Sequence, residues 1–153
     1  YWHRCAFKFQ RSKGFSTLST APTTTTTSKY IYNNNRNLTK EQFLEIKKRD
    51  GFVGINFYPL FLTGEKEAKI SDILKMTEYF LSLGGENIIG LGSDFDGVDC
   101  LPEGIFGVED VEKIFNEMAK IGYSDELMDK IAHKNFEKII KLLWNDEKYF
   151  LHF

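Results

Sequence analysis

Two short, nearly continuous apolar runs constrain the fold of this chain more than any other feature of its sequence. The first covers residues 52–57 (FVGINF), and the second begins at Ile88 and runs into the polar residues Gly92, Ser93 and Asp94. Runs of this length, apolar at almost every position, are typical of strands that are covered on both faces, as in a parallel sheet. The sequence therefore predicts parallel strands that alternate with helices, the pattern of α/β proteins.

Amphipathic segments precede, separate and follow these runs. A capping box at Thr39 and Gln42 predicts a helix from there to about Arg49. A second helix is expected from Ile70 to Leu83, ending at a glycine pair. The last third of the chain carries an apolar stripe at helical spacing, which is more typical of a core than of a cofactor site.

Composition divides the chain near residue 28. Residues 1–27 are rich in serine and threonine and show little periodicity, so we expect an irregular segment there. Residues 28–145 carry the regular pattern, and residues 146–153 are expected to form a tail. A length of 153 residues suits one domain; a complete eight-stranded (β/α) barrel needs about 250 residues.

Charge and cysteine content exclude several classes of protein. The chain has 20 basic and 22 acidic residues, so it lacks the excess of positive charge that is typical of proteins that bind nucleic acid. Its two cysteines, Cys5 and Cys100, lie far apart and predict neither a disulfide framework nor a thiolate zinc site. Because no apolar stretch reaches the length of a transmembrane helix and no signal peptide is recognisable, we expect a soluble, cytoplasmic protein.

The segment Gly92 to Gly97 (GSDFDG) is the strongest local indication of chemistry. It places Asp94 and Asp96 at the carboxyl end of a predicted parallel strand, where ligands and catalytic groups gather. A carboxylate there can exchange a proton or ligate a metal ion. The alternative is a simple turn whose aspartates accept backbone hydrogen bonds, and the spacing alone favours that alternative. A calcium loop counted from Asp94 fails, because the required glycine and glutamate positions hold Asp99 and Ile105.

Arginine and histidine residues add one further candidate. Arg36 precedes the capped helix, where its guanidinium could hold a carboxylate through two hydrogen bonds, although an arginine in a polar loop is usually just solvated. The histidines are His3, His133 and His152, and they form no zinc motif.

Several segments, in order along the chain, resemble the C-terminal half of membrane (renal-type) dipeptidases. They are RNLTKEQ from residue 36, GINFYP from 54, GLGSDFDGV from 90, PEG from 102 and GYS from 122. The resemblance covers about residues 28–145. It implies the C-terminal portion of a TIM-like (β/α)8 barrel of the amidohydrolase type, in which two zinc ions activate water to hydrolyse dipeptides.

The resemblance also implies roles for two residues. Asp94 matches the aspartate that contacts the attacking water or the leaving amine, and Arg36 matches the arginine that binds the substrate's free carboxylate. No zinc ligand carries over, because Thr25 and Ala6 stand where the family has metal-binding histidines. We therefore expect a fragment of a metallodipeptidase that is impaired by itself. The alternative is a non-catalytic half-barrel that binds another copy or a missing N-terminal half.

Overall fold

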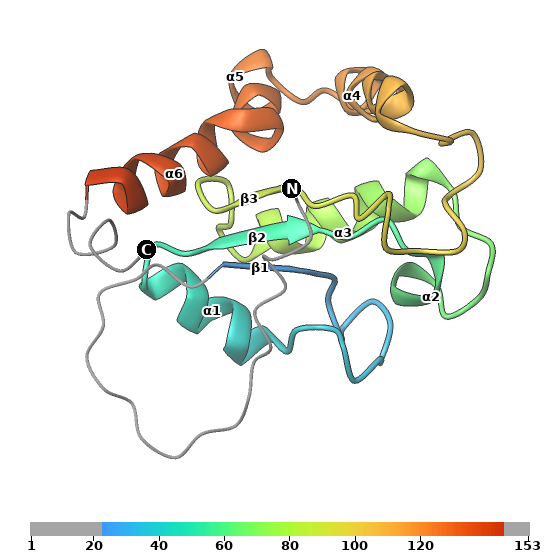
Figure 1. Cartoon of the computed structure of the whole chain (residues 1–153), viewed down its shortest axis with the longest axis horizontal. Coiled ribbons are helices and arrows are strands. Elements are labelled where there is room, and N and C mark those ends of the chain that lie inside the picture. The colour runs from blue at the N-terminus through green and yellow to red at the C-terminus, as the bar shows by residue number, and fades with distance from the viewer. Residues whose placement is uncertain (1–22, 146–153) are drawn as a thin grey trace.

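A parallel sheet of three strands forms the centre of the molecule. In the computed structural model, which describes residues 23–145, the strands are β1 (Thr23–Thr26), β2 (Phe52–Ile55) and β3 (Ile89–Leu91). Their order in the sheet is β1-β2-β3, with Thr25 opposite Gly54 and Gly54 opposite Gly90 (Figure 1). The predicted α/β class with parallel strands is confirmed.

Helices return the chain between successive strands. The helix α1 (Lys40–Lys48) connects β1 to β2, and α2 (Pro59–Leu62) and α3 (Ile70–Ser82) connect β2 to β3. The predicted capping box is present: the Thr39 hydroxyl accepts from the Gln42 N–H at 3.2 Å, and Gln42 Oε1 accepts from the Thr39 N–H at 2.9 Å. After α3, Gly84 takes a left-handed conformation with φ of 74°, as expected of a glycine that ends a helix.

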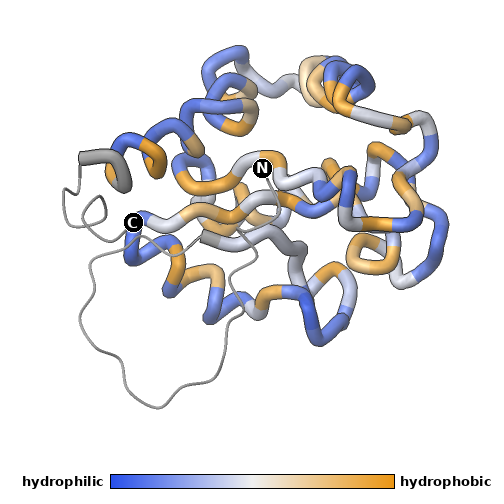
Figure 2. The backbone as a smooth tube through the Cα atoms, in the orientation of Figure 1, coloured by the Kyte–Doolittle hydropathy of each residue, from blue (hydrophilic) through white to orange (hydrophobic). Residues whose placement is uncertain are grey.

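The core is built from alternate residues of β2 and the inward faces of α1 and α3. Val53, Ile55 and Phe57 are completely buried, and the period of two along a strand directs them to one face. The rings of Phe43 in α1 and Phe80 in α3 stack in the same cluster with centroids 4.5 Å apart. Figure 2 shows mostly apolar or neutral residues along the central strands and hydrophilic stretches on peripheral helices and loops.

The last third of the described chain is helical, as predicted. It contains the short 3₁₀ turn η1 (Val108–Asp110), α4 (Val111–Lys120), α5 (Asp125–Asp129), the π-helical turn η2 (Lys130–Lys134) and α6 (Asn135–Asn145). The buried Asn135 side chain donates to the carbonyls of Glu86 and Ile89 at 3.0 and 2.7 Å. These bonds fasten the C-terminal helices to β3. The apolar pattern predicted the helices but gave no indication of the π-helical turn.

The structure differs from the sequence expectation at the N-terminal side. Residues 23–26, expected within an irregular segment, form β1. Threonine is β-branched and favours strands, and here its backbone pairs with a buried central strand, which local composition does not reveal. Residues 1–22 and the expected tail at 146–153 lie outside the described residues. Between residues 23 and 145, no helix is both long and apolar enough to cross a membrane.

The stacking of Phe43 on Phe80 generates a stability prediction. Phe43 is completely buried, whereas its neighbour Leu44 is 39% exposed. We expect Phe43→Ala to lower the free energy of unfolding by about 3–5 kcal/mol, because it removes buried contacts and leaves a cavity. Leu44→Ala, the control in the same helix, should cost less than about 1 kcal/mol. Urea denaturation followed by circular dichroism measures both, and equal losses would contradict the assigned core.

Candidate functional site

Three strand ends meet at one edge of the sheet and form the candidate site. Parallel strands present their carboxyl ends to the same edge. The ladders continue slightly beyond the strands, since the Asn56 N–H donates to the Thr26 carbonyl at 3.2 Å and the Gly92 N–H donates to the Ile55 carbonyl at 3.0 Å. Asp94 follows β3 at this edge, and its Oδ2 accepts from Asn56 Nδ2 at 3.1 Å. The structure thus places Asp94 where the sequence placed it.

Asp94 lies in a turn, and its carboxylate forms a hydrogen bond outside that turn. Its backbone has a φ of 62°, in the left-handed region that aspartate tolerates better than most residues. Its carbonyl accepts from the Gly97 N–H at 3.0 Å. The carboxylate instead reaches the neighbouring strand end at Asn56, while the residue remains exposed. The Asp94 backbone thus takes part in the turn, and its carboxylate bonds to a side chain at the end of the neighbouring strand.

Arg36 lies at the same edge, next to the end of β1. Its carbonyl accepts from the Thr26 hydroxyl at 2.7 Å. Its guanidinium carbon lies 5.8 Å from the centroid of the Phe61 ring, within the range of a cation–π contact. Arg36 itself is exposed. Thr26 bonds to Arg36, and Asn56 bonds to Asp94. Because Thr26 and Asn56 lie at the ends of adjacent strands, both bonds are at the same edge of the sheet.

A buried polar network holds the loop that carries Arg36. Asn37 is 3% exposed, and its Nδ2 donates to the carbonyls of Tyr32 and Phe61, each at 2.9 Å. The Thr27 hydroxyl lies 2.5 Å from Asn37 Oδ1 and 3.0 Å from the Phe61 carbonyl. A satisfied buried network of this kind rigidifies the segment around it. The sequence analysis did not single out Asn37 or Thr27.

Two glycines, Gly54 and Gly92, lie close together near Asp94 and leave room for the side chain of Thr25. A Cβ atom built on Gly54 would come within 3.0 Å of Gly92 Cα and 3.3 Å of Thr25 Oγ1. One built on Gly92 would come within 2.6 Å of Thr25 Cγ2 and 2.9 Å of the Gly54 backbone. The exposed Thr25 side chain therefore lies over both glycines, on the face of β2 that also carries Asn56. Larger side chains at either glycine would displace the strands.

A second polar group consists of Tyr58, which follows β2, and of Asp99 and Cys100, which follow β3. The Tyr58 hydroxyl is hydrogen-bonded to Asp99, which raises the pKa of Tyr58 and lowers the pKa of Asp99. Burial, and then the hydrogen bond with Asp99, raises the pKa of the Cys100 thiol. The raised pKa favours the thiol form of Cys100 over the thiolate, which is the form that acts as nucleophile and metal ligand.

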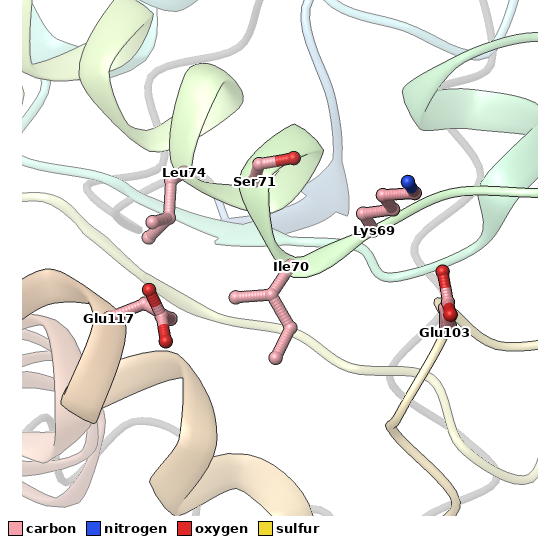
Figure 3. Close-up of a pocket in the computed structure, with 6 residues that line it drawn as sticks. All are labelled: Lys69, Ile70, Ser71, Leu74, Glu103 and Glu117. Carbon is pink, nitrogen blue, oxygen red and sulfur yellow. The ribbon is translucent and has the colours of Figure 1, made fainter.

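The cleft in Figure 3 lies elsewhere. It has a volume of about 250 Å³ and opens where α3 begins, between that helix, the loop after β3 and α4. Lys69, Ile70, Ser71, Leu74, Glu103 and Glu117 line it. It contains neither Arg36 nor Asp94, so the candidate site is defined by the sheet edge and not by this cleft.

Comparison with known proteins agrees with the arrangement of these motifs. A sequence profile of the membrane dipeptidase family, peptidase family M19, matches residues 13–147. The chain belongs to this family of membrane dipeptidases. The match begins before residue 28, where the resemblance seen in the sequence begins, and thus includes β1.

Relatives of this M19 chain include proteins of bacteria and fungi. An uncharacterized protein from the pqqA 5′ region of Klebsiella pneumoniae is 31% identical over 71% of this chain and 41% of its own length. An uncharacterized dipeptidase of Schizosaccharomyces pombe is 32% identical over 74% of this chain and 28% of its own length. The M19 chain thus spans less than half the length of these two curated relatives.

Solved structures show the same partial coverage. A metallo peptidase from Rhodobacter sphaeroides, liganded with a phosphinate mimic of the dipeptide L-Ala-D-Ala, superposes with a TM-score of 0.75 and 29% identity. The match covers 80% of this M19 chain and 36% of that one. The metallo peptidase dipeptidase AC of family M19 gives a TM-score of 0.76 at 30% identity, covering 80% and 38% of the two chains.

The described part of the M19 chain does not contain a metal centre. Among residues 23–145, no three histidine, cysteine, aspartate or glutamate side chains come together in a group that could hold a metal ion. Thr25 offers only a hydroxyl at the position where the resemblance expects a histidine. His133 lies on η2, with its Nδ1 2.8 Å from Glu137 Oε1. His3 and His152 lie outside the described residues. The donor set between residues 23 and 145 therefore does not fit a catalytic metal.

The network at Asn37 generates a prediction about this M19 chain. Asn37→Ala removes three hydrogen bonds of a buried side chain, those with the Tyr32 carbonyl, the Phe61 carbonyl and the Thr27 hydroxyl, so we expect the free energy of unfolding to fall by about 1–3 kcal/mol. We also expect faster hydrogen exchange at the amides of Lys29 and Leu38, which bond across the base of the loop. Asn35→Ala, at an exposed position in the same loop, is the control and should change neither quantity.

Proposed function

We propose that this chain is the C-terminal portion of a TIM-like (β/α)8 barrel of a zinc-dependent dipeptidase. The observation that carries the proposal is that Arg36 and Asp94 each bond to a residue at the carboxyl edge of one parallel sheet, in a chain of family M19. In such folds the active site is built from residues that follow the strands at this edge. The relatives described as metallo peptidases and dipeptidases support a peptide substrate.

The two residues carry complementary parts of the proposed reaction. Arg36 would bind the free carboxylate of a dipeptide, since a planar guanidinium donates two parallel hydrogen bonds to a carboxylate. Asp94 would accept a proton from the water that attacks the peptide carbonyl and return it to the amine that leaves. The hydrolysis then consumes one water and releases two amino acids, with Asp94 unchanged.

The chain by itself is proposed to be catalytically impaired. The zinc ions that the resemblance implies would need ligands from outside residues 23–145, because the described residues offer no suitable group. The attacking water would then lack the activation that a catalytic metal supplies. Arg36 and Asp94 would retain their positions, so binding and hydrolysis become separable properties in this chain.

The second candidate is a non-catalytic half-barrel that acts through assembly. Within residues 23–145, β1 and β3 each pair with β2 alone, so each presents one edge that no described strand covers. An uncovered strand edge is a template for pairing with another chain. A second copy of this chain or an N-terminal half of the barrel would fit such edges.

Metal content and activity test the first candidate. We expect inductively coupled plasma analysis of the purified chain to give less than about 0.1 zinc per chain after incubation with zinc, and no measurable hydrolysis of simple dipeptides. Stoichiometric zinc together with turnover would contradict the proposed impairment. Light scattering tests the second candidate, which a monomer at all concentrations would contradict.

Binding separates the roles of Arg36 and Asp94. We expect Arg36→Ala to weaken dipeptide binding at least about tenfold, because hydrogen bonds between charged groups contribute about 1.5–3 kcal/mol. Asp94→Asn should bind nearly as well as the unaltered chain. Isothermal titration calorimetry measures both. The control is Arg49→Ala, which replaces an arginine at the end of α1. If this variant weakens binding as much as Arg36→Ala does, the proposed role of Arg36 is wrong.

A further inference from the structure

Asn56 connects the end of β2 to Asp94. Its main-chain N–H continues the pairing with β1 through the Thr26 carbonyl, so its backbone position is fixed by the sheet. Its side chain belongs to a residue that is only 2% exposed. A buried amide needs hydrogen-bond partners, and both ends of this one have them.

The orientation of the amide follows from its contact with Tyr58. The backbone N–H of Tyr58 can only donate, so the Asn56 atom 2.7 Å from it is the oxygen, Oδ1. The nitrogen, Nδ2, must then face Asp94, and it lies 3.1 Å from Oδ2. Asp94 therefore meets a donor and not an acceptor, and a donor stabilises a carboxylate in that place.

Gly97 confines the other oxygen of the same carboxylate. A methyl group in place of its hydrogen would overlap Asp94 Oδ1 and come within 3.0 Å of Asp94 Cγ. Gly97 therefore provides the space into which Oδ1 fits, while its N–H donates to the Asp94 carbonyl. The Asp94 side chain is exposed, yet each of its carboxylate oxygens has a defined place.

We propose that Asn56 is a positioning residue for Asp94, which holds one carboxylate oxygen through Nδ2 and leaves the other to exchange a proton with substrate or water. The inference rests on the role proposed above for Asp94. It explains why a polar side chain is buried at the end of an otherwise apolar strand. It also assigns a function to a residue of the FVGINF run for which the sequence alone predicts no individual role.

The test measures the χ1 rotamer of Asp94 by three-bond couplings to Cγ in nuclear magnetic resonance spectra of the whole chain. We expect the unaltered chain to show one rotamer at neutral pH. Asn56→Asp keeps the size of the side chain and an acceptor for the Tyr58 N–H but replaces the donor with a carboxylate oxygen. We expect that variant to lose the single rotamer, and to regain it in acid when the introduced carboxyl group carries a proton. Asn56→Ala should show averaged couplings at every pH.

Asn135→Ala is the matched control, because it also removes a buried side-chain amide, one that donates to the carbonyls of Glu86 and Ile89 at the other end of β3. We expect it to lower stability and to leave the Asp94 couplings unchanged. Averaged couplings in the unaltered chain, unchanged couplings in Asn56→Asp, or a loss of the rotamer in Asn135→Ala would each overturn the proposal. Failure of the proposed function appears separately, as absence of dipeptide binding while the effect of Asn56 on the Asp94 rotamer persists.

Discussion

The pairing of β2 with a parallel neighbour on each side is the constraint on which the rest of this structure depends. Because β2 is buried along its whole length, its backbone groups must be satisfied by β1 and β3. The three strands pair in one continuous register. This pairing brings Thr26, Asn56 and Asp94, which are far apart in the sequence, to one edge of the sheet. The candidate site is a consequence of this alignment.

Around that edge, small and polar residues replace the apolar ones that fill the core. Gly54 and Gly92 carry no side chain next to Thr25, so that Thr25 can lie across them. Asn37 and Thr27 use buried hydrogen bonds to hold the loop that carries Arg36. The opposite face of β2 is packed with large apolar residues. The large apolar residues thus stabilise the sheet, and the small and polar residues gather near its carboxyl edge.

Membership of family M19 connects this arrangement to peptide hydrolysis. The described residues, however, lack a group of side chains that could hold a metal ion. The residues that contact substrate in the proposed mechanism, Arg36 and Asp94, are both at the expected edge. The residues that would hold metal are not found between positions 23 and 145. In the proposed mechanism, substrate binding and metal binding therefore depend on different parts of the sequence, and Arg36 and Asp94 would serve the first.

The sequence by itself determined the α/β class, β2 and β3, and the capped helix at Thr39. It also placed Asp94 after a strand and Arg36 before the capped helix, because these features depend on local periodicity, capping and turn chemistry. Only the tertiary structure decided that residues 23–26 form a strand, since a threonine run becomes one here by pairing with β2. It also decided that Asn56 contacts Asp94 and that Asn37 is buried. Those contacts join residues distant in the chain, and no local pattern encodes which partner a polar side chain meets.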